Sequence, residues 1–297
     1  MLHIIESVNH LAATSAELAR HELTAAKAAL LGLVEGVTEY LPISSSGHLI
    51  VTERLVDIGR HAQTKDAADT YTITIQAGSI LAVLVVYWSR VVEMVRGLAG
   101  RDDEGRRLLT ALAIAFVPAA IVGLVAEKVI KKHLFGVWPV VVAWIIGGIV
   151  ILVLARPLHE RARAGAPLEA ITVRAAVLIG VAQCFALWPG TSRSLVTILA
   201  ALAVGLTVTG AIEFSFLLGL VTLTAATGYD ALKHGSEMFH TYGVLNPVIG
   251  FVVAFVAALV AIRWLLAYLQ RHDLSIFGWY RLAIAAIAII LLATGVL

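Results

Sequence analysis

Residues 42–48 read Pro42-Ile43-Ser44-Ser45-Ser46-Gly47-His48, and they interrupt an apolar stretch that extends from residue 24 to residue 57. A second apolar stretch, residues 174–208, is interrupted in the same way by Pro189-Gly190-Thr191-Ser192-Arg193-Ser194. Each remaining arm has about 12–17 residues, fewer than the roughly 20 that a helix needs to cross a bilayer. We therefore predict two re-entrant helix-break-helix hairpins. Their turns would lie inside the membrane, where irregular backbone is tolerated only if protein buries it or it lines a wet cavity.

Six other segments are apolar enough, and long enough, to cross about 30 Å of hydrocarbon as helices. They are residues 71–88, 108–126, 137–155, 211–228, 246–264 and 279–297. The composition agrees, because 60% of the 297 residues are hydrophobic and only 14% are charged, whereas soluble domains are about 45–50% apolar and about 25% charged. We therefore predict an all-α polytopic membrane protein with six transmembrane helices and two re-entrant hairpins.

The two interrupted stretches also resemble each other. Gly32-Leu33-Val34-Glu35 followed by Pro42-Ile43-Ser44 aligns with Gly180-Val181-Ala182-Gln183 followed by Pro189-Gly190-Thr191, with one residue of gap. Three predicted spans follow each hairpin, so the second hairpin would enter from the opposite face and the two turns could meet near the midplane. Inverted repeats of this kind occur in several transporters. We predict one membrane domain, residues 1–297, with repeat 1 over about 24–155 and repeat 2 over about 174–297.

The charges restrict the remaining possibilities. A formal net charge of +2 argues against a nucleic-acid partner. The single cysteine, Cys184, cannot form an intramolecular disulfide, and no Cys and His residues have zinc-like spacing, so oxygen-ligated divalent cations are the remaining candidate metals. Residues 1–23 are interpreted as an amphipathic, interfacial helix.

Lysine and arginine are slightly unequal on the two faces. Loops 89–107, 156–174 and 263–281 together hold 12 of them, against 9 on the other face. The richer face is expected to be cytoplasmic, with both termini and the entrance of the first hairpin outside.

The first hairpin carries acids and hydroxyls. Glu35 and Glu39 are four residues apart and share one helix face, so both could bind a divalent cation, or one could act as a base while the other holds metal. A carboxylate costs roughly 2.5–3.5 kcal/mol at mid-bilayer, so the pair implies a polar cavity, a partner or a function. The alternative is a segment in water, or two protonated structural residues.

The serines of the first turn stand before a helix N-terminus, which is an anion site as well as a place for N-caps. Capping is the simpler interpretation of Ser46, whereas Ser44 and Ser45 lie nearer the expected cleft. A lone histidine is usually structural, but His48 follows the carboxylate pair closely and is expected to be catalytic.

The second turn supplies Arg193, whose planar guanidinium suits a phosphate. The alternative is a buried structural ion pair between Arg193 and Glu35 or Glu39. Ser192, Ser194 and Thr197 surround the arginine. Together the two turns offer acids, hydroxyls, an imidazole and an arginine, a set that suits hydrolysis of a phosphoric anhydride on a lipid.

At these residues the chain closely resembles the bacterial undecaprenyl-pyrophosphate phosphatase family, the bacitracin-resistance type. The paired-acid segment of the family reads here as residues 35–48, and its motif Pro-Gly-x-Ser-Arg-Ser-x-x-Thr as residues 189–197. Residues 75–79 and 213–216 extend the similarity over nearly the whole chain. Leu195, where the family often has Gly, and Val221, in a stretch where Pro is frequent, depart from the pattern without removing a chemical group.

The resemblance implies hydrolysis of undecaprenyl diphosphate to the monophosphate carrier used in peptidoglycan synthesis, with Mg²⁺ or Ca²⁺ required, and hence bacitracin resistance. It places the protein in the bacterial inner membrane, and the charge bias opens its active site to the periplasm; a homodimer is left open. Ser45 is the expected nucleophile with Glu39 or His48 as base, although direct attack by His48 stays open. The assignments are catalysis by Glu39, Ser45, His48 and Arg193, substrate binding by Ser44, Gln183, Ser192, Arg193, Ser194 and Thr197, and metal binding by Glu35 and Glu39.

Two other classes compete with this hypothesis. Ser46-Gly47-His48 and Ser192-Arg193 superficially match the acid-phosphatase-type lipid phosphatases, but those need a histidine six residues after the arginine, where Leu199 stands. A transporter or flippase for an isoprenoid phosphate would explain the inverted repeat. Such a binding site has little use for serines, His48 and two acids together.

Overall fold

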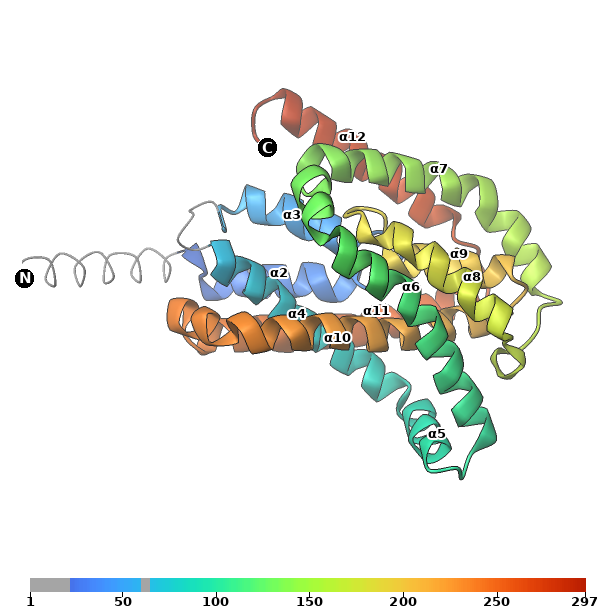
Figure 1. Ribbon diagram of the computed structural model, residues 1–297. Helices are drawn as coiled ribbons and strands as arrows, with labels where there is room; N and C mark the ends of the chain where they lie inside the picture. Colours follow the sequence, from blue (N-terminus) through green and yellow to red (C-terminus); the bar gives the residue numbers. More distant parts are fainter. Residues whose placement is uncertain (1–21, 60–64) are drawn as a thin grey trace, which may run out of the picture.

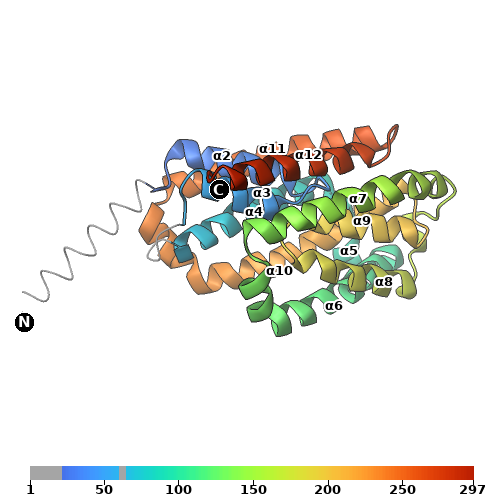
Figure 2. The same cartoon turned by 90° about the horizontal axis from the view of Figure 1, so that it is seen from above.

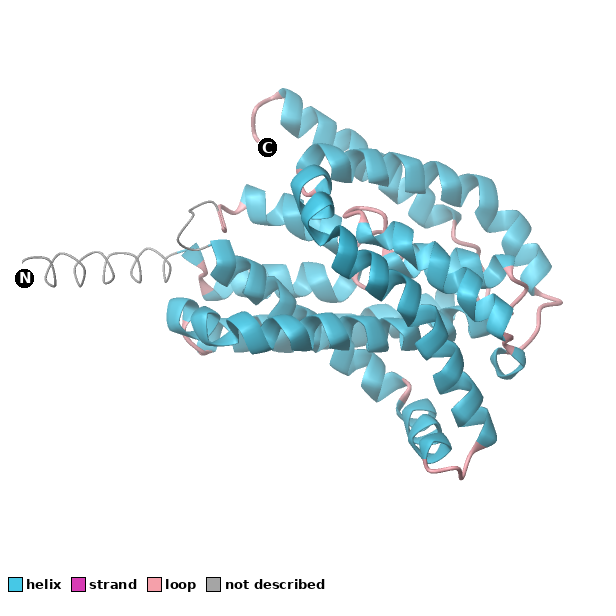
Figure 3. Cartoon of the chain, in the orientation of Figure 1, coloured by secondary structure: helices cyan, strands magenta, loops and turns pink. Residues whose placement is uncertain are grey.

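The computed structural model describes residues 22–59 and 65–297, and within these ranges it consists of α-helices and two short 3₁₀ turns, with no strand (Figures 1 and 3). The interfacial helix predicted for residues 1–23 lies, except for its last two residues, outside the described part. The elements are α2 (Ala25–Thr38), α3 (Ser45–Leu55), α4 (Lys65–Val86), α5 (Trp88–Leu98), α6 (Asp103–Leu134), α7 (Val137–Ala162), η1 (Leu168–Ala170), α8 (Val173–Gln183), η2 (Cys184–Leu187), α9 (Arg193–Ala203), α10 (Val208–Tyr242), α11 (Leu245–Leu269) and α12 (Ser275–Ala293).

All six predicted spans are confirmed as helices that are long and apolar enough to cross a membrane. They lie in α4, α6, α7, α10, α11 and α12. Several helices begin earlier than predicted because polar residues cap them. Asp102, for example, accepts the Gly105 amide at 2.8 Å and starts α6 in charged sequence. The protein is an all-α, multi-pass membrane protein.

The loop predicted over residues 89–107 is wrong in its first half, because α5 occupies it. This short helix is charged on one side and buries Met94 and Gly97 on the other. Gly97 lies against the backbone of Gly105 and Arg106 at the start of α6, and a Cβ atom there would collide with it. The absence of a side chain therefore lets α5 and α6 cross in close contact.

The helices of the two halves pack in equivalent pairs. α2 packs along α11 and α8 packs along α6, while α4 lies on α10 and α7 on α12 (Figures 1 and 2). Gly32 lies against the Gly250 carbonyl of α11, and the corresponding Gly180 lies against the Ala115 carbonyl of α6, so a small residue permits the same close approach twice. Two repeats related by a twofold axis produce this pattern.

The hairpins match residue for residue, and the single gap in the sequence alignment was wrong. Thr24 and Thr172 cap α2 and α8, Ser44 and Ser192 cap α3 and α9, and each pair is separated by 148 positions. Pro42 therefore corresponds to Gly190 rather than to Pro189. The geometry is consistent with two re-entrant hairpins. Their depth in the bilayer and the repeat boundaries stay predictions.

Candidate active site

The two turns are built in the same way. Ser44 and Ser192 have φ of 77° and 76°, a region that side chains rarely occupy. Each hydroxyl accepts the backbone N–H three residues ahead at 3.3 Å, which caps the helix that follows. As a result Ser45 and Arg193 are the first residues of α3 and α9, with their side chains free to meet from opposite hairpins.

Glu39 joins these two residues. Its Oε1 accepts a hydrogen bond from Nη2 of Arg193 at 2.9 Å, and its Oε2 accepts one from the Ser45 hydroxyl. Glu39 is buried, whereas Ser45 is partly exposed. A hydroxyl that donates to a carboxylate beside a guanidinium has the arrangement of a nucleophile, its base and an anion-binding group.

Arg193 is held in place from several sides. Its Nη1 donates to the Ser215 carbonyl at 3.0 Å, and the guanidinium lies 5.6 Å from the centre of the Tyr40 ring. Thr197 forms hydrogen bonds with the Ser215 hydroxyl at 2.6 Å and the Arg193 carbonyl at 2.8 Å, and its role in substrate binding stays a prediction. A Cβ atom on Gly219 would occupy the space of the guanidinium, so this glycine leaves room for it.

Ser46 and Ser194 occupy equivalent positions in the two turns, and each forms a hydrogen bond with the other hairpin. Ser194 donates to the Leu41 carbonyl at 3.1 Å, and Ser46 accepts the Gly190 amide at 3.4 Å. Ser194 also bonds Ser192 at 3.0 Å, and Ser46 bonds Ser44 at 3.2 Å. Hydrogen bonds of these four serines thus connect the two turns. Among the four, Ser46 is exposed.

His48 is buried near the first turn but does not contact Ser45 or Glu39 through a hydrogen bond. Its Nδ1 lies 2.7 Å from the Ser44 carbonyl, which makes that nitrogen the donor, and its Nε2 then accepts from the Tyr280 hydroxyl at 2.9 Å. The ring also packs against Trp144, with centroids 5.0 Å apart. The catalytic role of His48 stays a prediction.

Glu35 and Gln183 occupy equivalent positions and share one peculiarity. Both are buried, and neither polar atom of either side chain has a close hydrogen-bond partner in the described part of the chain. The buried Ser79 hydroxyl of α4 lies near enough to Glu35 to interact with its carboxylate. Neither residue belongs to the network of Glu39. Because an unpaired buried carboxylate is costly, Glu35 is a position where a cation would be stabilising.

No group of three or more His, Cys, Asp or Glu residues is arranged as a metal site within residues 22–59 and 65–297. Glu35 and Glu39 supply two carboxylates one helical turn apart, and hard divalent cations prefer such oxygens. The residues present therefore fit a cation that takes its other ligands from phosphate and water, as Mg²⁺ commonly does.

Arg281 is a buried charged residue near the two turns that the sequence analysis missed. It was counted among the loop charges, but it is fully buried within α12. Without it the loop count falls to 11 against 9. The available signal was its position two residues inside the predicted span 279–297, where a charged residue is expected to be functional. Ser215 and Tyr280 were also missed, and only the folded chain brings them to the turns.

The stretch 213–216 contributes on two sides of α10. Ser215 faces Arg193, whereas Glu213 accepts from Arg90 of α5 at 2.5 Å. Arg90 also pairs with Glu169 at 2.6 Å, outside the membrane-spanning helices. A hydrogen bond from its own backbone and the pairing with Arg90 hold the pKa of Glu169 below its ordinary value. This cluster fixes α5 to the second repeat.

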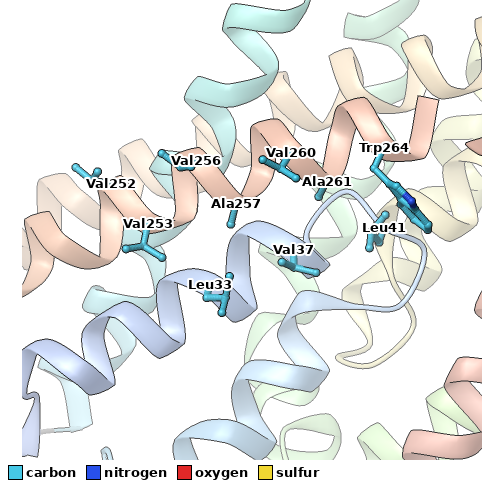
Figure 4. A pocket seen from close by; sticks show the side chains of 10 residues that line it. All are labelled: Leu33, Val37, Leu41, Val252, Val253, Val256, Ala257, Val260, Ala261 and Trp264. Atoms are coloured by element: carbon cyan, nitrogen blue, oxygen red, sulfur yellow. The ribbon is translucent and has the colours of Figure 1, made fainter. Parts of the chain in front are cut away.

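An apolar groove of about 580 Å³ runs between α2 and α11 and ends at the first turn (Figure 4). Leu41, whose carbonyl Ser194 holds, lies at the end of the groove beside Trp264. The remaining walls are also apolar side chains. They are Leu33, Val37, Val252, Val253, Val256, Ala257, Val260 and Ala261.

The chain is similar to known proteins over most of its length. A family model described as bacitracin resistance protein BacA matches residues 28–287. The chain is 45% identical over 264 residues to an undecaprenyl-diphosphatase of Sorangium cellulosum, covering 88% of this chain and 84% of that protein. It is 47% identical over 264 residues to undecaprenyl-diphosphatase 2 of Rhodospirillum rubrum, covering 89% and 93%. An undecaprenyl-diphosphatase of Nitrosomonas europaea is 42% identical over 274 residues, covering 91% and 95%.

With a matching model over most of its length and relatives of this identity, the chain belongs to the bacitracin resistance protein BacA family.

Proposed function

We propose that this protein hydrolyses undecaprenyl diphosphate to undecaprenyl phosphate and inorganic phosphate. The observation that carries the proposal is the contact of Ser45, Glu39 and Arg193 across the two hairpins. Relatives named undecaprenyl-diphosphatase support the same reaction. By returning the lipid carrier to peptidoglycan synthesis, the activity would confer bacitracin resistance.

The geometry supports Ser45 as the nucleophile. Its oxygen attacks the terminal phosphorus while Glu39 takes the hydroxyl proton. The bond between this phosphorus and the bridging oxygen breaks, and its electron pair leaves with the lipid monophosphate. Water then attacks the phosphoserine, inorganic phosphate departs, and Ser45 recovers its proton from Glu39. Arg193 holds the terminal phosphate throughout and stabilises the charge that develops on it.

His48 has a different task in this proposal. Its two nitrogens are occupied by the Ser44 carbonyl and the Tyr280 hydroxyl, and direct attack would require one of these bonds to break. We assign His48 to orienting the turn that presents Ser45. Ser44, Ser192, Ser194 and Thr197 act in the same way, through hydrogen bonds that hold the turns and Arg193.

We propose Mg²⁺ or Ca²⁺ as the cofactor, held by Glu35 and Glu39. When bound, such an ion would neutralise phosphate oxygens and so assist the approach of a nucleophile. The buried carboxylate of Glu35, which has no close hydrogen-bond partner among the described residues, supports this placement. Gln183, the uncharged equivalent of Glu35, is assigned to the substrate through its unpartnered amide.

The apolar groove between α2 and α11 is proposed as the seat of the polyprenyl chain. It is apolar throughout and ends at Leu41, two residues from Glu39, so a chain in the groove can be continuous with a diphosphate at the turn. The protein would act in the bacterial inner membrane. The small excess of Lys and Arg on the opposite loops supports an opening to the periplasm.

The experiment is phosphate release from undecaprenyl diphosphate by purified protein in detergent, with and without EDTA. We expect release in the presence of Mg²⁺ or Ca²⁺, loss with EDTA, and recovery when the ion is returned. A phosphoserine trapped at Ser45, and absent in Ser45→Ala, would identify the nucleophile. Binding of the lipid without any phosphate release would contradict the proposal.

A further inference from the structure

Arg281 is a buried cation that has no carboxylate partner within residues 22–59 and 65–297. Its guanidinium has five N–H groups, and all of them find backbone carbonyls. Nε donates to Trp144 at 3.4 Å and Nη2 to Ala143 at 2.8 Å, both on α7. The remaining bonds reach the two turns, namely Pro42 at 3.4 Å, Thr191 at 3.2 Å and Gly190 at 2.7 Å.

The carbonyls of the two turns are related by the repeat. Pro42 and Gly190 are separated by the same 148 positions as the capping serines Ser44 and Ser192. Arg281 therefore holds equivalent atoms of both hairpins from one point, although it comes from only one repeat. Each of these carbonyls lies three residues before the first residue of the following helix, Ser45 in α3 and Arg193 in α9.

Resting on the function proposed above, we propose that Arg281 is a positioning residue that sets the separation between Ser45 of the first hairpin and Arg193 of the second. It acts through the backbone of the turns and does not touch the substrate. A neutral residue could not satisfy five carbonyls, and a lysine offers three donors from a single point instead of a planar fork.

The space for Arg281 is also built into α7. A Cβ atom on Gly147 would collide with the guanidinium. Gly147→Ala therefore disturbs Arg281 while leaving its charge and all its donors in the chain. Gly123 of α6 gives the matched control, because a Cβ there meets only the Leu187 side chain at an ordinary 3.6 Å.

The test compares Arg281→Lys, Arg281→Gln and Gly147→Ala with the parent in a Cys184→Ala background. We expect kcat for phosphate release to fall roughly 10- to 100-fold per folded molecule, as reacting groups shift by about 1 Å, with a smaller change in KM. Compared with Arg281→Gln, Arg281→Lys should bring the amount of folded protein back to that of the parent, but its kcat should stay reduced. Arg263→Gln, which changes an exposed arginine of α11, should match the parent.

A second readout is independent of catalysis. Spin labels at Leu55 and Ala203, the exposed and equivalent last residues of α3 and α9, report the distance between the hairpins. The distance distribution should be narrow in the parent and shifted or broadened in the Arg281 and Gly147 variants. Unchanged distances together with unchanged kcat per folded molecule would overturn the proposal. If the parent itself releases no phosphate, the proposed function fails and the distances still decide the role of Arg281.

Discussion

The two hairpins have one backbone and two chemistries. Their capping threonines, their capping serines and the first residues of the helices that follow correspond at a constant separation, as does the positive φ of Ser44 and Ser192. The side chains at equivalent positions differ, since the first hairpin has Glu35, Glu39, Ser45 and His48 where the second has Gln183, Leu187, Arg193 and Val196. The first hairpin thus carries the acids and the second the cation.

This division explains how a symmetric scaffold can hold one site. Two identical hairpins would place like charges face to face across the axis, which is destabilising where water is scarce. Complementary hairpins instead place the carboxylate of Glu39 2.9 Å from Arg193. The duplication supplies the two turns, and the divergence of their side chains supplies the hydroxyl, the carboxylate and the guanidinium that meet between them.

The largest effect should come from removing the groups on which the hairpins differ. Glu39→Gln is expected to lower kcat by about 10²–10⁴-fold through loss of the base, and Arg193→Lys by about 10²–10³-fold through loss of the planar fork. Phosphate release in detergent measures both. Leu187→Ala, the equivalent position of Glu39, is the control, and an equal loss there would erase the distinction between the hairpins.

A smaller effect is expected on the concentration of divalent cation that the activity requires. Glu35→Gln makes the two hairpins alike at this position and should raise the Mg²⁺ concentration for half-maximal activity by roughly tenfold or more, as one of two carboxylate ligands becomes neutral. Gln183→Glu in the same protein should not restore it, because Leu187 provides no second acid. If Glu35→Gln leaves the Mg²⁺ dependence unchanged, the assignment of Glu35 to the cation site is wrong.

The apolar groove between α2 and α11 lies on the outer face of the first hairpin, so substitutions there test a difference between the two hairpins. Leu33→Trp should fill it and lower kcat/KM several-fold for undecaprenyl diphosphate but little for farnesyl diphosphate, whose chain is short. The expected change in kcat/KM is modest because membrane lipid competes with the substrate for the groove. The substrate chain is favoured over lipid only by its van der Waals packing against the walls. Val181→Trp on α8 is the matched change, and equal effects of the two variants on both substrates would refute the assigned groove.

The smallest effect tests the sameness of the hairpins. Ser44→Ala and Ser192→Ala should each destabilise the protein by about 1 kcal/mol through loss of an N-cap, and the two Gly variants by only a few tenths. Glycine also relieves the positive φ. Chemical unfolding in detergent micelles provides the comparison. A turn at which Gly is less stable than Ala would show that the two backbones are held differently.

The sequence was sufficient for features that depend on local pattern. Apolar length predicted the six spans. The polar breaks indicated two interrupted segments, and they pointed to Glu39, Ser45 and Arg193, which the structure brings into contact. Helix α5 was missed because it is short and charged. The repeat was aligned on Pro42 and Pro189, which look alike, whereas the backbone equates the capping serines.

The sequence analysis could not predict contacts between residues that lie far apart in the chain. Tyr280 lies 232 positions from His48, and Arg281 lies 239 from Pro42. No local spacing connects such residues. The predicted span began at residue 279, whereas α12 begins at Ser275. Because of this difference of a few residues, Arg281 was counted with the loop charges, and its contacts with both turns were not foreseen.

Each hairpin packs on a helix of the opposite repeat, and this has a consequence for the insertion of the chain into the membrane. Helix α2 finds its packing surface on α11, and α8 finds its own on α6, so each hairpin rests on a span of the opposite repeat. The first hairpin is synthesised early but cannot dock until more than half of the chain has followed. Until then the acids of the first hairpin lack the surroundings that α11 provides, so this hairpin can pack fully only after most of the chain has been inserted.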